Sequence, residues 1–215
     1  MIQDPEAFIL ANTRVLRPPH CPELRLHLAD NAVELWNATE EELGRIGLAP
    51  PFWAFAWAGG QALARFVLDQ PELVAGKRVV DLASGSGLVA IAAMRAGAAS
   101  AIAVDIDPFA AAAAALNARL NSVEIETRTA DVIGAPLEAD ILFVGDLFYD
   151  RAIAERLLAW LSELQLRGLA VRVGDPGRSY FPKDRFELLA EYRIPVTRAL
   201  EDAEIKQTGV WRLQA

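Results

Sequence analysis

The segment DLASGSGLVAIAAMRAG, residues 81–97, constrains the fold of this chain more than any other. An apolar stretch from Arg78 to Ala83 predicts a buried strand, and a helix is expected from Leu88 to Ala96. A strand that runs through a short turn directly into a helix is the start of a β-α-β unit. Glycine destabilises helix and strand interiors by about 0.5–1 kcal/mol relative to alanine, so the two glycines of the turn indicate a close approach to the backbone.

Strand and helix patterns alternate along the rest of the chain. Further strands are expected at Ala101–Asp105, Val123–Thr129, Ala139–Gly145 and Leu169–Val173, with helices at Ala62–Leu68, from Asp107-Pro108 onward, at Ala152–Leu166 and at Lys183–Tyr192. Apolar runs without alternation predict a parallel sheet covered on both faces. Two more strands are expected within Val196–Leu213, and Gly209–Leu213 follows its predecessor too closely for a helical crossover. The prediction is an α/β fold, doubly wound, with five or six parallel strands and one antiparallel strand.

Residues 1–50 do not show this alternation and predict a short extension packed on the core domain of residues 51–215. A helix is expected at Asp4–Ala11 and a strand at Leu24–Leu28. The residues from Thr39 to Glu42 form a capping box, which predicts a helix that ends near Gly44 or Gly47.

Composition excludes several classes of protein. The formal charge of −8 argues against nucleic acid as a partner and is compatible with a cationic substrate. The single Cys21 excludes an intrachain disulfide, and its spacing to the two histidines matches no metal-ligand pattern, so no metal is expected. No apolar run reaches the roughly 20 residues that a membrane helix needs. We expect a cytoplasmic monomer, or a mitochondrial matrix protein if a transit peptide was removed.

Acidic residues follow three of the expected strands. In open α/β sheets, ligands bind beyond the carboxyl ends of the strands, and an acid about 20 residues after the glycine turn binds ribose hydroxyls, which is the place of Asp105. Asp81 precedes the turn, where a carboxylate disfavours a pyrophosphate and favours an ammonium group. S-adenosylmethionine carries an ammonium, a ribose and an adenine, whose amino group Asp131 is placed to bind. The alternatives are a nicotinamide cofactor and ordinary strand-end caps.

The expected strand at 139–145 ends in the sequence GDLFYD, at the edge of the sheet where ligands of open α/β folds bind. A carboxylate beside aromatic rings suits an acceptor that arrives as a cation, and the lysine ammonium, with a reference pKa near 10.4, is such a cation. Asp146 is expected to orient the amine, and Phe148 and Tyr149 to hold it. The alternative is that both rings are core residues at the start of a helix, with Asp146 as its cap.

Asp81 to Gly87, together with Asp105, resembles the cofactor motif of the seven-β-strand S-adenosylmethionine-dependent methyltransferases, although Ala83 stands where that family usually has glycine. The blocks PFWAFAWAGG, GSG, DIDP, GDLFYD and GDPGR, between residues 51 and 211, resemble more specifically the lysine methyltransferases of the electron transfer flavoprotein β-subunit. This resemblance implies a Rossmann-like, mostly parallel sheet of seven strands. It implies a cofactor site made of Trp57, Asp81, Ala83, Ser84, Gly85, Gly87, Asp105, Ile106, Asp131 and Gly145.

The resemblance also implies the activity. It predicts transfer of methyl groups from S-adenosylmethionine to lysines of the flavoprotein β-subunit, with S-adenosylhomocysteine as the product. Methylation of another protein, such as a ribosomal protein, and a catalytically silent cofactor-binding subunit are the alternatives. Arg178, after the strand expected at 169–173, belongs either to a structural turn or to a loop that faces acidic groups of the substrate.

Overall fold

The computed structural model describes residues 4–30, 50–196 and 204–214. In this part of the chain, one sheet has seven strands in the order β5-β4-β3-β6-β7-β9-β8. Their bounds are β3 (Arg78–Leu82), β4 (Ser100–Asp105), β5 (Glu126–Thr129), β6 (Ile141–Gly145), β7 (Ala170–Asp175), β8 (Phe186–Pro195) and β9 (Ile205–Leu213). The pairs from β5 to β7 are parallel, whereas β9 is antiparallel to both β7 and β8. The predicted seven-stranded, mostly parallel sheet is confirmed, and so is the antiparallel direction of its final segment.

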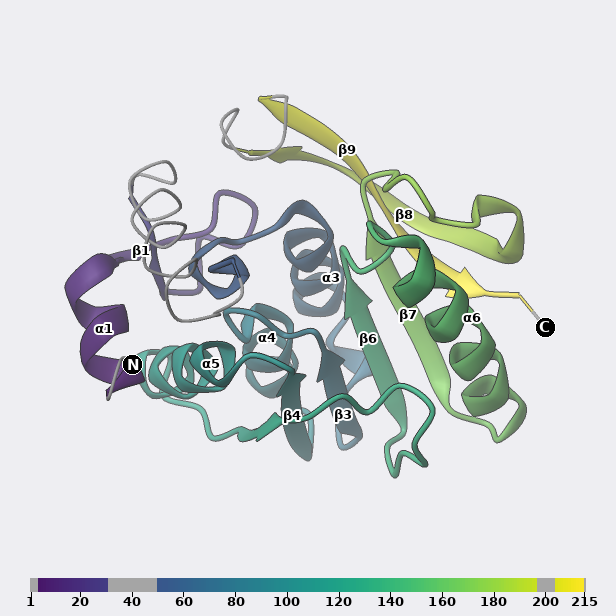
Figure 1. The fold of residues 1–215 in the computed structure, drawn as a ribbon, viewed down its shortest axis with the longest axis horizontal. Helices are drawn as coiled ribbons and strands as arrows, with labels where there is room; N and C mark the ends of the chain where they lie inside the picture. Colours follow the sequence, from purple (N-terminus) through teal and green to yellow (C-terminus); the bar gives the residue numbers. More distant parts are fainter. Residues whose placement is uncertain (1–3, 31–49, 197–203, 215) are drawn as a thin grey trace.

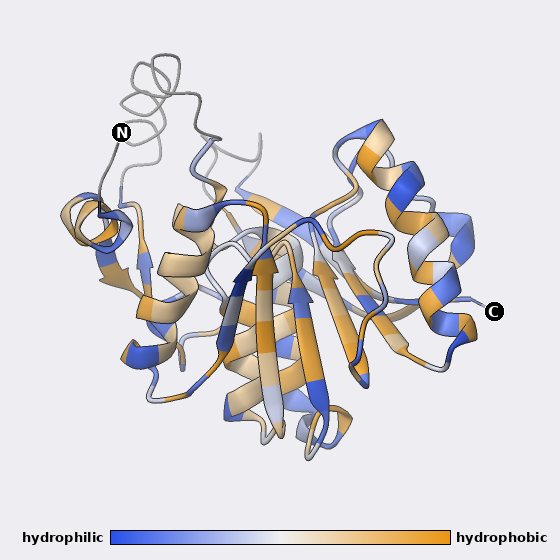
Figure 2. Ribbon diagram, turned by 60° about the horizontal axis from the view of Figure 1, so that its bottom comes forward, coloured by the Kyte–Doolittle hydropathy of each residue, from blue (hydrophilic) through white to orange (hydrophobic). Residues whose placement is uncertain are grey.

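Helices cover both faces of this sheet (Figure 1). Helices α3 (Ala58–Asp69), α4 (Leu88–Arg95) and α5 (Pro108–Leu120) lie on one face, and α6 (Arg151–Leu166) lies on the other. Along β6, Ile141 and Phe143 join the core under α3 and α4, while Leu142 and Val144 join the core under α6. Burial on both faces explains why the central strands are mostly hydrophobic (Figure 2). Among the described residues, no helix has the length and apolar character needed to cross a membrane.

Side-chain caps fix the starts of α5, which follows β4, and of α6, which follows β6. The Asp107 carboxylate accepts a hydrogen bond from the Phe109 N–H at 2.8 Å, and Pro108 occupies the first turn of α5. The Asp150 carboxylate accepts from the Ile153 N–H at 2.9 Å at the start of α6. The cap predicted at Asp107 is confirmed.

The N-terminal residues pack against α5. They form α1 (Pro5–Asn12) and an antiparallel pair of β1 (Arg14–Leu16) and β2 (Leu26–Leu28), close to the expected helix and strand. The His27 N–H donates to Asn117 Oδ1 at 2.7 Å, and the Arg25 N–H donates to Asn121 Oδ1 at 3.0 Å. The helix predicted from Thr39 lies outside the described residues, and the domain division at residue 50 stays a prediction.

The helix predicted at Lys183–Tyr192 is wrong. Lys183–Arg185 forms one short 3₁₀ turn, and strand β8 follows and pairs with β9 along its length. The ring of Phe186 contacts Phe148 and Phe181, with centroid distances of 6.1 and 5.0 Å. Sheet pairing and this aromatic packing outweigh the local helical preference, which is a weak determinant. Of the two strands expected after residue 195, the described residues contain only β9.

Candidate active site

The candidate residues gather at the carboxyl edge of the sheet, where the strand order reverses. The chain goes from β3 outward to β4 and β5, and then returns to β6 on the other side of β3. Ligands of open α/β sheets bind in the crevice at such a point. Asp105 ends β4, Asp146 follows β6, and the glycine turn follows β3. The fold therefore brings together cofactor and acceptor candidates that lie far apart in the sequence.

The turn after β3 has a backbone that most residues avoid. The φ angles are 52° at Ala83, 49° at Gly85 and 76° at Gly87. Alanine in this left-handed region is strained, which is the consequence of its departure from the glycine of the family pattern. A Cβ on Gly87 would lie 2.7 Å from the Cβ of Ala114, so Gly87 allows α4 to pack closely on α5. A Cβ on Gly85 would lie 3.7 Å from the Phe52 oxygen, so the segment before α3 passes close to this turn.

Asp105 holds the turn from the neighbouring strand. One of its carboxylate oxygens accepts a hydrogen bond from the Gly85 N–H at 2.9 Å, and the other accepts from the Asp107 N–H at 3.1 Å. Burial raises the pKa of Asp105 above its ordinary value. The next residue, Ile106, is 69% exposed, which makes it an apolar side chain available to a flat ring. Asp105, predicted to bind the ribose, and Ile106, another predicted cofactor residue, therefore lie next to each other at the end of β4.

Asp81 has a structural task that differs from the predicted one. Its side chain is buried, and its Oδ2 accepts a hydrogen bond from the Ala90 N–H at 3.0 Å, in the first turn of α4. Burial raises the pKa of Asp81 to about 8. Direct contact with a cofactor ammonium does not fit a carboxylate that is 2% exposed and turned toward the helix. We assign Asp81 to holding α4 against the turn.

Asp131 lies exposed beyond the end of β5 and has two partners. It accepts a hydrogen bond from the Ile133 N–H at 3.0 Å and forms an ion pair with Arg156 of α6 at 2.9 Å. The hydrogen bond from Arg156 is the main reason that the pKa of Asp131 is lowered. The pairing with Arg156 was not predicted, because α6 and β5 are distant in sequence. Asp131 stays a predicted contact of the adenine amino group.

Three further predicted cofactor residues have different surroundings. The Oγ of Ser84 is buried and has no hydrogen-bond partner within the described residues. A Cβ on Gly145 would lie 3.2 Å from the Gly60 nitrogen, so this glycine lets α3 approach β6. Trp57, just before α3, donates from its indole nitrogen to the Phe52 carbonyl at 2.9 Å. This hydrogen bond fixes the orientation of the Trp57 ring, which borders the candidate site.

Asp146 lies at the point where α3 meets the ends of β6 and β7. Its φ angle is 56°, and its N–H donates to the Gly174 carbonyl at 3.0 Å. Its Oδ2 accepts from the Gly60 N–H at 3.1 Å, in the first turn of α3, where the helix dipole favours a negative charge. A Cβ on Gly59 would lie 2.2 Å from the Gly174 oxygen and 2.6 Å from Asp146 Oδ2. The glycines thus permit the contact that fixes the carboxylate.

Arg178 is the partner of Asp146 that sequence reasoning did not find. Its Nη2 and Nε donate to Asp146 Oδ1 at 2.6 and 3.2 Å, and the two side chains are 19% and 11% exposed. The guanidinium carbon also lies 5.7 Å from the centre of the Trp57 ring. The sequence pattern left Arg178 as either a turn residue or a substrate-facing residue. The ion pair places it in the candidate site, and the only signal was its position in the loop after a strand end.

The two aromatic residues after Asp146 separate in the structure. Phe148 is 0% exposed, and its ring packs on Phe181 and Phe186, with centroid distances of 5.3 and 6.1 Å. We therefore correct its predicted contact with the acceptor to a packing role. Tyr149 is 49% exposed and lies 6.1 Å from the ring of Phe52, which is 40% exposed. These two rings form an accessible aromatic rim beside Asp146.

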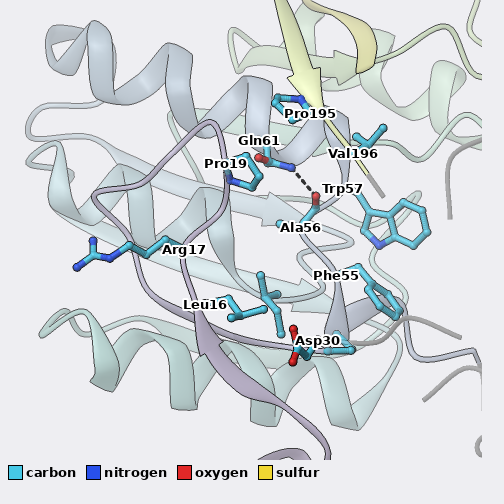
Figure 3. Close-up of a pocket in the computed structure, with 13 residues that line it drawn as sticks. Leu16, Arg17, Pro19, Asp30, Phe55, Ala56, Trp57, Gln61, Pro195 and Val196 are labelled. Atoms are coloured by element: carbon cyan, nitrogen blue, oxygen red, sulfur yellow. Dashed lines mark hydrogen bonds between the residues drawn. The ribbon is translucent and has the colours of Figure 1, made fainter. Parts of the chain in front are cut away.

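A cavity of about 360 Å³ lies between the N-terminal residues and the segment before α3 (Figure 3). Trp57 and Gln61 line it, and the Gln61 amide donates to the Ala56 carbonyl at 2.7 Å. Of the predicted cofactor residues, it shares only Trp57. The cavity therefore adjoins the candidate site without containing the glycine turn.

Solved structures with this fold include methyltransferases. Magnesium protoporphyrin IX methyltransferase from Synechocystis PCC 6803, solved with bound S-adenosylmethionine, matches with a TM-score of 0.55 at 16% identity over 73% of this chain and 80% of that chain. A putative RNA methyltransferase from Pyrococcus horikoshii matches with a TM-score of 0.53 at 16% identity over 85% of this chain and 95% of that one. At these identities the likeness shows that this chain shares its fold with these methyltransferases.

Sequence relatives identify the family to which this chain belongs. The electron transfer flavoprotein beta subunit lysine methyltransferase of Xenopus laevis is 36% identical over 98% of this chain and 87% of the relative, and the Homo sapiens protein is 35% identical over 98% and 83%. The family model of ribosomal protein L11 methyltransferase (PrmA) matches residues 62–156. This chain belongs to the family of electron transfer flavoprotein beta subunit lysine methyltransferases, as its sequence motifs predicted.

Proposed function

We propose that this protein methylates lysine side chains of the electron transfer flavoprotein beta subunit. The family assignment supports the substrate, because the relatives that match nearly the whole chain carry that substrate in their names. The observation that carries the acceptor chemistry is the carboxylate of Asp146, held by the N-terminus of α3 beside an exposed aromatic rim. A negative charge next to aromatic faces is suited to an alkylammonium ion.

The residues around the glycine turn fit S-adenosylmethionine. Asp105 lies 2.9 Å from the Gly85 nitrogen and would bind the ribose, and the exposed Ile106 would cover the adenine. Ser84 Oγ has no partner in the described structure, so the turn retains a polar atom for a ligand. When bound, the cofactor supplies a methyl group on a positively charged sulfur, which keeps the C–S electron pair as the new N–C bond forms.

The remaining task of the protein is to prepare the acceptor nitrogen. Lysine is almost fully protonated at neutral pH and must lose a proton before its lone pair can attack. Asp146 would orient the ammonium and pass its proton toward solvent, while Tyr149 and Phe52 exclude water from one side. Transfer then depends mainly on holding the nitrogen in line with the sulfonium.

A labelling experiment tests this function. Purified protein and radiolabelled S-adenosylmethionine are added to a cell extract, with Asp146→Asn as the control, and labelled proteins are identified by mass spectrometry. Asparagine keeps the backbone bond to Gly174 and the size of the side chain, but removes the charge. We expect label on lysine of the beta subunit and a loss of at least about 100-fold in the control.

The other outcomes separate the alternatives. Label on a different protein, such as a ribosomal protein, would retain the chemistry and replace the substrate. No protein label from an enzyme that binds the cofactor would indicate a silent subunit and overturn the proposal. The absence of a nucleic-acid partner is proposed from the net charge of −8, and the monomeric state and the cytoplasmic or mitochondrial location stay predictions.

A further inference from the structure

Arg178 occupies the surroundings that the proposed function gives to the acceptor ammonium. Its guanidinium contacts Asp146 Oδ1 at 2.6 Å and lies 5.7 Å from the centre of the Trp57 ring. A carboxylate on one side and an aromatic face on the other is the environment that a lysine ammonium would also require. Two cations, one from this chain and one from the substrate, would therefore compete for one place.

The backbone of the loop that carries Arg178 is firmly held. Asp175 Oδ1 accepts hydrogen bonds from the Gly177 and Arg178 N–H groups, both at 2.7 Å. The Asp175 side chain is buried, and its Oδ2 has no hydrogen-bond partner among the described residues. The Tyr180 N–H donates to the Phe148 carbonyl at 3.0 Å. Since the backbone is fixed at both ends of the loop, the guanidinium is the part that is able to leave.

Exchange of one cation for another preserves the charge balance of the site. Asp146 is 11% exposed, and a carboxylate at this depth is strongly disfavoured without a compensating charge. Arg178 supplies a positive charge in the resting protein, and a lysine ammonium would supply it in the complex. A neutral acceptor that displaced the arginine would not replace its positive charge beside Asp146.

We propose that Arg178 is a placeholder cation that the acceptor alkylammonium displaces from Asp146, and that this exchange selects cationic acceptors. The proposal rests on the proposed function, because that function makes Asp146 the acceptor site. Asp175 is a positioning residue, since it fixes the loop from which the guanidinium reaches Asp146. If Arg178 occupies the acceptor position beside Asp146 about nine-tenths of the time, the apparent affinity for the acceptor is about tenfold weaker than the intrinsic affinity.

The test compares Arg178→Gln with Arg151→Gln, a matched loss of charge nearby. Arg151 is exposed and lies over the ring of Tyr180, at 5.5 Å from its centre, outside the site. With the flavoprotein beta subunit as acceptor, we expect Arg178→Gln to lower KM about tenfold while the Kd for S-adenosylmethionine stays unchanged. Guanidinium ion at millimolar concentration should inhibit this variant competitively against the acceptor and leave the wild type unaffected. Arg151→Gln should match the wild type.

Other results would overturn the proposal. A raised KM in Arg178→Gln would show that the arginine binds the acceptor, and a lowered kcat and Tm with unchanged KM would show a structural clamp.

If the wild type does not methylate the beta subunit, the proposed substrate is wrong. Calorimetric titration of n-butylammonium into the S-adenosylhomocysteine complex then decides the inference by itself. Tighter binding to Arg178→Gln supports the placeholder, and equal binding contradicts it. If the glutamine variant does not fold, Arg178→Lys, which keeps the charge, replaces it in these measurements.

Discussion

The two sides of the site satisfy their buried carboxylates in different ways. On the cofactor side, Asp81 and Asp105 accept hydrogen bonds from backbone N–H groups of the turn and of α4. On the acceptor side, Asp146 accepts one backbone N–H and also pairs with the side chain of Arg178. Backbone donors belong to the fold and cannot leave without local unfolding. A side-chain donor can turn away, so a carboxylate with such a partner is prepared for an exchange of ligand.

The largest effect is expected from a change that pushes α3 away from β7 on the acceptor side. A Cβ on Gly174 would lie 2.2 Å from the Gly59 oxygen and 2.7 Å from the Leu63 side chain. Gly174→Ala should therefore lower the free energy of unfolding by about 1–3 kcal/mol, as overpacking does. It should also reduce methyl transfer sharply, because the Gly174 carbonyl accepts the N–H of Asp146. Chemical denaturation and initial rates measure the two effects.

Gly60→Ala is the stability control for this variant. A Cβ there meets nothing within 4 Å, and Gly60 is helical, so its free energy of unfolding should stay unchanged or rise by about 0.4–1 kcal/mol. Equal stability of the wild type and both variants would contradict the tight junction between α3 and β7.

The second-largest effect is expected on the cofactor side of the site, in the affinity for S-adenosylmethionine. Asp105→Ala removes a carboxylate that bonds to the turn and is placed to bind ribose. Hydrogen bonds to charged groups contribute about 1.5–3 kcal/mol, so the Kd for S-adenosylmethionine should rise about 10–100-fold. Calorimetry provides the measurement, and Asp146→Asn should retain the wild-type Kd. Unchanged affinity in Asp105→Ala would remove the ribose assignment.

A third effect is a dependence of stability on pH that comes from Asp81. Its pKa is raised from 3.8 to about 8 by burial, so the folded protein holds this proton more tightly than the unfolded chain does. The stabilisation from this bound proton is complete below the ordinary pKa and is lost as pH rises through about 8. Asp81→Asn should flatten that decline, since its amide oxygen still accepts the Ala90 N–H. Urea denaturation of the cofactor-free protein between pH 5 and 8 checks this, and parallel curves would argue against it.

The smallest effect is expected at the exposed ion pair of Asp131 and Arg156. Both side chains are about half exposed, and such pairs contribute about 0–1 kcal/mol to stability. Arg156→Gln should therefore change Tm very little. A Kd for S-adenosylmethionine that also stays within about twofold would mean that Asp131 does not depend on this partner for its position. A large loss of affinity would instead make Arg156 part of the cofactor site.

The sequence predicted the fold around the glycine turn well, because the signals for it are local. A glycine turn between an apolar strand and a helix, and Asp105 at the next strand end, are read within about 25 residues. The acceptor half depends on contacts between distant elements. The ion pair of Asp146 and Arg178 spans 32 positions, and β8 exists as a strand because of its pairing with β9. No local pattern distinguishes a buried Phe148 from an exposed Tyr149.

The position of β9 also sets the order in which this domain can be completed. β9 lies between β7 and β8, although it follows both of them in the chain. Until residues 205–213 are made, β7 has an unpaired edge and β8 has no neighbour in the sheet. Since β7 carries Gly174 and leads into the loop of Arg178, the acceptor side must be the last part of the domain to reach its final form during synthesis.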